Sequence, residues 1–132
     1  MSRTRKAGPV AVAAGLVAML LALLAGCTKE PVDPGRDAAH ARLRDYVAAL
    51  NTNRAQDVGL VVRRPADSDD VAERLRAYGG RALAAVEVSS INEFPRVYHT
   101  SVRATDGAGA AVAFDQVIEW QDDHWSFAPF AP

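Results

Sequence analysis

Residues 117–127, VIEWQDDHWSF, alternate apolar and polar side chains on either side of two adjacent aspartates. This pattern is typical of a β-hairpin with a two-residue turn. With Asp122 and Asp123 as the turn, Trp120 faces Trp125 across the hairpin, and residue 118 faces residue 127. The large apolar side chains then share one face. The two tryptophans are either core residues or a partly exposed aromatic pair near the mouth of the fold.

Upstream of this hairpin the same period of two continues. We predict four strands, over residues 81–91, 96–104, 110–120 and 124–130, with DGAG and QDD as the turns between the last three. Strands that follow one another through short turns form an antiparallel meander. The C-terminal half is therefore expected to be a four-stranded antiparallel sheet.

The pairing of the second and third strands has two candidate registers. A three-residue loop ending in a left-handed Gly109 pairs Tyr98 with Ile118 and leaves His99 on the outer face. A two-residue loop flips every side chain, places His99 inside and buries Arg103. Because an unpaired buried arginine is costly, we favour the first register.

Before residue 80 the apolar period is helical. A stripe at i, i+3, i+4 and i+7 predicts a first helix over residues 37–50; its members are Leu43, Tyr46, Val47 and Leu50. Asp33, followed by a proline, or Asp37 is expected to cap it. A second helix is predicted over 54–62.

A third helix is predicted between residue 68 and the Gly79-Gly80 pair, a stop signal. Ser68 or Asp67 is its expected cap, and Val71, Leu75 and Tyr78 form its inner stripe. Its aspartates at 67, 69 and 70 are interpreted as cap and first-turn acids. Helices followed by an antiparallel sheet make an α+β fold.

The element order resembles the NTF2-like (cystatin-like, cone-shaped) family. The residues that carry the resemblance are YVAALNTNRAQDV (46–58), which looks like the family's first two helices, and the closing hairpin VIEWQDDHWSF. The resemblance spans about 37–130. It implies a cone of three N-terminal helices packed on a curved four-stranded antiparallel sheet.

The cone interior is the expected site. Its predicted polar lining is neutral and comprises Tyr46, Tyr98, Thr100 and Gln116, with Trp120 near the mouth. Some NTF2-like enzymes, such as ketosteroid isomerases, use a first-helix tyrosine, and Tyr46 resembles it by position. Their acidic base has no counterpart here, so we predict no catalytic residue. A small apolar ligand or a protein partner is the expected occupant.

Two other functions remain open. An isomerase or dehydratase acting on a small hydrophobic substrate would require an acid or base inside the cone, which only an inward His99 supplies. A structural homodimer would use the outer sheet face, which carries Val117 beside the small residues Ala111 and Ala113.

The N-terminus resembles a bacterial lipoprotein precursor. Residues 1–6 carry three positive charges and residues 7–26 carry none, as in a secretory signal peptide. An uncleaved membrane helix is the alternative. Leu24-Ala25-Gly26-Cys27 matches the lipobox, which implies cleavage between Gly26 and Cys27 and acylation, palmitate included, of the Cys27 thiol. Two or more acyl chains anchor a protein stably to a membrane.

The predicted organisation is therefore a cleaved signal peptide (1–26), a lipidated cysteine and tether (27–36) and the α+β domain (37–132). Such a protein is expected on the extracytoplasmic face of a cell membrane, inner or outer. All 16 acidic residues but only 12 of the 15 basic ones follow residue 26, so the mature chain is mildly acidic and no nucleic-acid partner is expected.

The remaining chemistry is sparse. One cysteine permits no intramolecular disulfide. The three histidines His40, His99 and His124 are not spaced as metal ligands, and we expect His40 on an exposed helix face and His124 at a turn. We predict no metal and no cofactor.

Overall fold

The computed structural model describes residues 32–132. The predicted signal peptide, the cleavage site at Gly26 and the acylation site at Cys27 lie outside the described residues. Among residues 32–132, no helix combines the length and apolar composition that a membrane span requires.

Three helices precede the sheet, as predicted. They are α2 (Arg36–Thr52), α3 (Ala55–Val62) and α4 (Asp69–Tyr78). The cap of α4 is confirmed as Ser68, whose hydroxyl accepts a hydrogen bond from the Val71 amide at 3.3 Å. Gly79 is the C-cap that ends α4.

The predicted cap of the first helix is wrong, although the helix begins within one residue of its predicted start. Gly35 occupies the N-cap position of α2, and no side chain caps the helix. The Asp33 carboxylate instead accepts hydrogen bonds from the Gly35 amide at 2.9 Å and from the Tyr98 hydroxyl at 2.9 and 3.1 Å. The Asp33 side chain therefore binds Gly35 and strand residue Tyr98 and does not cap the helix. Asp37 lies in the first turn of the helix.

The sheet has four antiparallel strands in the order β1-β2-β3-β4. They are β1 (Ala84–Phe94), β2 (Val97–Thr105), β3 (Ala111–Gln121) and β4 (His124–Phe127). The first strand begins three residues later than predicted, and both Ala82 before it and Ala85, its second residue, adopt positive φ. The last strand ends early because the following tail, residues 128–132, turns toward α4.

Both predicted registers are confirmed. Trp120 pairs with Trp125 around a turn in which Asp122 and Asp123 have φ of 51° and 59°. Tyr98 pairs with Ile118, and Gly109 adopts a φ of 83° in the loop between β2 and β3. Positive φ at both central residues is the requirement of a type I′ turn.

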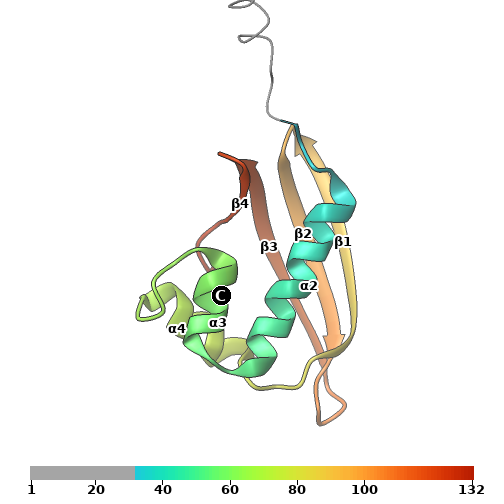
Figure 1. The fold of residues 1–132 in the computed structure, drawn as a ribbon. Helices are drawn as coiled ribbons and strands as arrows, with labels where there is room; N and C mark the ends of the chain where they lie inside the picture. The colour runs from blue at the N-terminus through green and yellow to red at the C-terminus, as the bar shows by residue number, and fades with distance from the viewer. Residues whose placement is uncertain (1–31) are drawn as a thin grey trace, which may run out of the picture. The chain divides into compact units, whose positions relative to one another are not determined.

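The helices cover one face of the sheet (Figure 1). Helix α2 packs on β1 and β2, and α3 reaches β4. The fold is thus α+β, with the core between the two layers. The largest fully buried apolar side chains are Tyr46, Leu43, Leu50, Ile118, Val58, Val71 and Val102.

Candidate functional site

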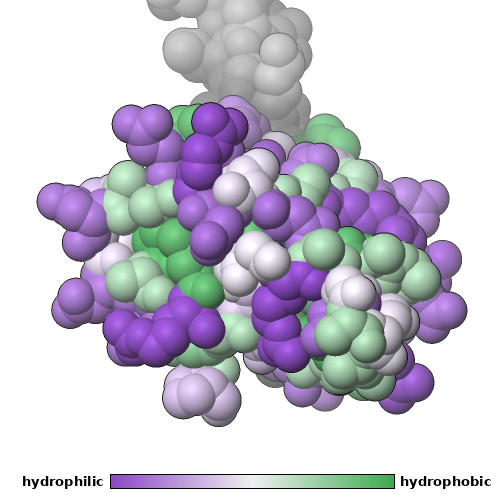
Figure 2. Space-filling view, turned by 90° about the horizontal axis from the view of Figure 1, so that it is seen from below, coloured by the Kyte–Doolittle hydropathy of each residue, from purple (hydrophilic) through white to green (hydrophobic). Residues whose placement is uncertain are grey.

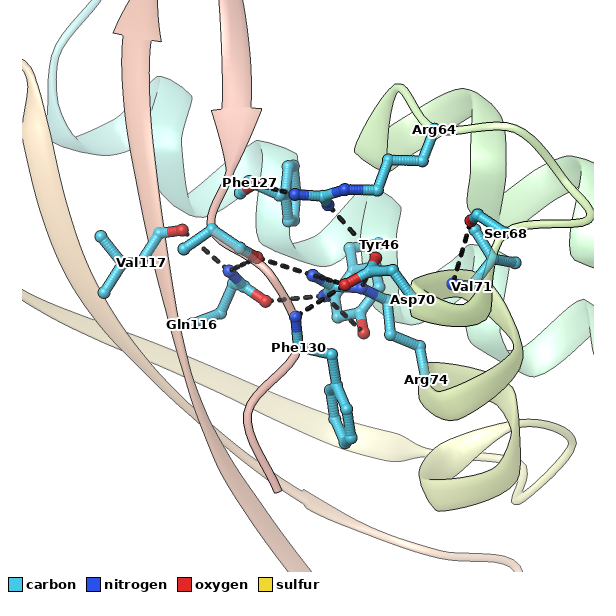
Figure 3. Close-up of polar contacts among 11 residues, drawn as sticks. Tyr46, Arg64, Ser68, Asp70, Val71, Arg74, Gln116, Val117, Phe127 and Phe130 are labelled. Carbon is cyan, nitrogen blue, oxygen red and sulfur yellow. Dashed lines mark hydrogen bonds and ion pairs between the residues drawn. The ribbon is translucent and has the colours of Figure 1, made fainter.

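One charged side chain occupies the interior between the helices and the sheet. Arg74 of α4 is fully buried, and it is the largest such side chain among residues 32–132. Its Nε donates to the Asp70 carboxylate at 2.7 Å, and one terminal nitrogen donates to the Gln116 side-chain oxygen at 2.7 Å and to the Tyr46 hydroxyl at 3.2 Å. Figure 3 shows these groups converging on the guanidinium.

The same guanidinium holds the tail that follows β4. Its second terminal nitrogen donates to the Ala128 carbonyl at 2.7 Å. The rings of Tyr46, Phe127 and Phe130 surround it, with centroids 5.4, 5.9 and 5.9 Å from Cζ. Cation–π attraction of this kind strengthens when the cation is removed from water.

Asp70 neutralises the buried charge. Its carboxylate accepts hydrogen bonds from Arg74, from Arg64 at 3.2 Å and from the Phe130 amide at 2.7 Å. Burial by itself would raise the pKa of Asp70, but these donors outweigh burial and hold the pKa below its ordinary value. Asp70 is therefore more than the first-turn acid that the sequence indicated.

The partner groups have shifted pKa values of their own. Burial alone would lower the pKa of Arg74, but the hydrogen bond to Asp70 and the nearby Tyr46 hydroxyl raise it overall. Burial raises the pKa of Tyr46. Arg74 therefore stays charged and Tyr46 stays protonated around neutral pH, so the network fixes positions and does not move protons.

Sequence reasoning missed Arg74, although a signal was present. Arg74 lies three residues after Val71 and four before Tyr78, both of which belong to the apolar stripe of α4. A cation on an apolar stripe with an acid four residues earlier indicates a buried ion pair. Asp70 supplies that acid.

An open cavity of about 820 Å³ lies beside this network. Three of the predicted lining residues, Tyr46, Thr100 and Gln116, border it. The other two, Tyr98 and Trp120, belong to a separate aromatic cluster. In that cluster the Trp125 ring packs edge-on against Trp120 at 5.1 Å and against Tyr98 at 5.7 Å.

The tail and the sheet form the walls of the cavity. Three aromatic residues missed as lining residues border it, from helix α4, strand β3 and the tail respectively: Tyr78, Phe114 and Phe130. The Tyr78 ring lies 4.7 Å from Phe114 and 6.2 Å from Phe130. On the sheet side, the Ser101 hydroxyl donates to the Asp115 carboxylate at 2.7 Å. The lining is therefore mixed, with aromatic carbon opposite small polar groups.

The histidines are placed apart from one another. His99 lies on the outer face of the sheet opposite Val117, as the favoured register predicts. His40 was expected to be exposed but is half-buried, because its Nε2 lies 2.8 Å from the Ser90 hydroxyl. His124 lies at the β3–β4 turn. Within residues 32–132, no three metal-ligating side chains gather.

The outer sheet face carries several apolar groups, including Ile91, which pairs with His99 and is exposed. Ala111 and Ala113 are exposed, and Val117 is half-buried. The face seen from below in Figure 2 carries both hydrophobic and hydrophilic patches.

Comparison of the chain with protein-family models, curated proteins and solved structures finds no match.

Proposed function

We propose that this chain is a lipoprotein, anchored through Cys27 on the extracytoplasmic face of a cell membrane, whose NTF2-like domain binds a protein partner. The lipobox order Leu24-Ala25-Gly26-Cys27 supports the anchor. The sequence of three helices and a four-stranded antiparallel sheet supports the family resemblance.

The observation that carries the binding function is the strand edge that β3 leaves open beside the cavity, next to an interior occupied by Arg74. Arg74 occupies the space in which a cone-shaped domain would hold a ligand, and its neighbours are engaged with it (Figure 3). By contrast, β4 pairs with β3 only as far as Ile118. The first half of β3 therefore has a partner on one side only.

The free edge can be assigned residue by residue. The Val117 carbonyl accepts from the Ala128 amide at 2.9 Å, so Val117 directs its backbone groups toward the β4 side. Alternate residues of a strand point the same way, so Asp115 and Ala113 do so too. Among residues 32–132, these groups of Ala113 and Asp115 have no hydrogen-bond partner.

An unpaired strand edge is a template for a further strand. The sequence around it, AAVAFD (110–115), contains no lysine or proline that would protect the edge, and Asp115 is its one charged residue. The cavity lies along this edge, with Tyr78 and Phe130 available to side chains of the incoming segment. We therefore assign the site to an extended segment of a partner protein.

A small apolar ligand is the second candidate occupant. The cavity volume of about 820 Å³ falls within the range of roughly 300–1,000 Å³ that ligand sites span. Native mass spectrometry of the protein extracted from its membrane separates the two, because a retained small molecule adds a discrete mass.

Site-specific photocrosslinking in the host cell tests the partner assignment. A photoreactive residue at Ala113 should give one discrete protein adduct, and the same residue at the exposed Ala72 of α4 should not. Ala113→Pro, read from a crosslinker at Ala111, should abolish the adduct because proline removes the edge donor. Equal labelling at Ala113 and Ala72, or none at either, would overturn the assignment.

Intact-mass analysis of detergent-extracted protein tests the anchor separately. The expected mass is that of residues 27–132 plus two or three acyl chains. The Cys27→Ser variant should be lost from the membrane fraction. A species that retains residues 1–26, or that carries a free thiol, contradicts the anchor.

A further inference from the structure

We propose that one end of the domain rests on the bilayer surface, with the Phe94 side chain in the headgroup layer. This end, here called the tether end, comprises Asp33, the β1–β2 turn (94–97) and the β3–β4 turn (121–124). The proposal depends on the lipid anchor at Cys27 and adds an orientation and a lipid contact to it.

Chain length limits how far the tether end stands from the lipid. Asp33 is six residues after Cys27 in the sequence. Six residues span at most about 20–22 Å when fully extended. The nine-residue strand β2 is about 30 Å long at the usual rise per residue. The tether is thus shorter than the sheet, so the tether end is the part held near the membrane.

The structure fixes where the tether meets the fold. The Tyr98 hydroxyl donates to both oxygens of Asp33, at 2.9 and 3.1 Å. Tyr98 is the second residue of β2, immediately after the β1–β2 turn, in which Phe94 pairs with Val97. Figure 1 shows the start of α2 beside the ends of β1 and β2. Asp33 and Phe94 therefore lie at the same end of the sheet.

The tether end carries an exposed aromatic side chain. Among residues 32–132, four large apolar residues are exposed: Phe94 lies in the β1–β2 turn, Ile91 lies three residues before it on β1, and Val32 directly precedes Asp33 in the sequence. The Phe94 side chain is 62% exposed at the turn itself. The fourth, Leu60 on α3, is 76% exposed elsewhere in the domain and serves as a matched control.

Charge does not explain the contact. The tether end carries Arg96 but also Asp33, Asp122 and Asp123, so its balance is acidic. An acidic surface gains nothing from anionic lipids. The contact is therefore apolar, and it should form equally on zwitterionic vesicles.

The two tryptophans of the chain, Trp120 and Trp125, flank the β3–β4 turn and report on this end alone. Full-length lipidated protein is reconstituted into phosphatidylcholine vesicles with and without nitroxide on the headgroups. Flotation in the same sample measures anchoring, and quenching of tryptophan fluorescence measures proximity. We expect the wild type to float and to be quenched, Phe94→Ser to reduce quenching at least twofold, and Leu60→Ser to match the wild type.

The outcomes separate the two proposals. Failure to float contradicts the anchor at Cys27. Flotation without quenching, or equal quenching in Phe94→Ser and Leu60→Ser, overturns the orientation while leaving the anchor intact. A Phe94→Trp variant gives a second readout: its emission should shift to the blue on vesicle binding, and an unchanged spectrum would also overturn the lipid contact.

Discussion

The guanidinium of Arg74 lies 2.7 Å from the side-chain oxygen of Gln116, and this contact joins helix α4 to strand β3 across the interior. A second bond from the same group reaches the Ala128 carbonyl. One side chain therefore connects the helical layer, the sheet and the tail. Such a connection should be visible in stability, in its pH dependence and in the placement of the tail.

Arg74→Met should destabilise the domain strongly. The substitution keeps much of the apolar stem but leaves the Asp70 charge and the Gln116 oxygen without their donor. Breaking a buried pair by removing one partner costs about 3–5 kcal/mol. Urea unfolding measures the loss, with Arg76→Met on the exposed side of the same helix as the control. Equal midpoints for the two variants would show that the network contributes no stability.

Asp70 should make the free energy of unfolding fall at acid pH. Its pKa is lower in the folded protein than the ordinary 3.8 because its donors outweigh burial. The folded state then binds fewer protons than the unfolded chain, so this stabilisation is complete above about pH 4 and is lost as the pH falls through the folded pKa.

The test is Asp70→Asn, compared with Asp69→Asn at an exposed first-turn position. Asp70→Asn should lower the free energy of unfolding at pH 7 and flatten its decline below about pH 4. If the free energy of unfolding of both variants declines with falling pH as steeply as that of the wild type, the acid sensitivity originates in other groups.

Substitutions in the β3–β4 turn should make the folded domain more stable. Asp122 and Asp123 both adopt positive φ, which costs most residues energy and which asparagine and glycine tolerate best. The double substitution Asp122→Asn with Asp123→Gly should raise the melting temperature, because the left-handed conformation costs a residue other than glycine about 1–2 kcal/mol. Thermal unfolding followed by circular dichroism provides the measurement, and a lower melting temperature would contradict the turn assignment.

Tyr98→Phe should loosen the start of α2. It removes the hydroxyl that donates to Asp33 and retains the ring that packs on Trp125. A hydrogen bond to a charged acceptor contributes about 1.5–3 kcal/mol when buried, and this one is partly exposed, so we expect about 1 kcal/mol. Amide exchange at residues 39–41, whose amides make the first hydrogen bonds of α2, should rise in Tyr98→Phe and stay unchanged in Tyr78→Phe, which removes a hydroxyl from the last residue of α4.

The sheet was largely predictable from the sequence because its turns carry specific chemistry. Asp122 and Asp123 fix the register of the last hairpin, and Gly109 fixes that of the preceding one. Because burying Arg103 would be costly, the register that leaves it exposed was preferred, and Arg103 is exposed in the structure. Local rules and a burial argument were sufficient there.

Long-range polar partners were not predictable in the same way. Asp33 has the sequence features of a helix cap, yet its carboxylate is taken by Tyr98, 65 residues away. The pairing of Arg74 with Asp70 had a local signal within α4, but the other acceptors of Arg74 come from α2, β3 and the tail, which the sequence does not place together. The aromatic wall of the cavity depends on the tail in the same way, since Phe130 reaches Tyr78 only after β4 ends early.

The bond between Tyr98 and Asp33 also determines how the domain carries mechanical load. Tension on the chain ahead of Asp33 reaches β2, an inner strand of the sheet, before it reaches the first turn of α2. A strand flanked by β1 and β3 resists such a pull through two ladders at once. Until the hydrogen bond between Tyr98 and Asp33 breaks, force applied there is divided between the sheet and the start of the helix.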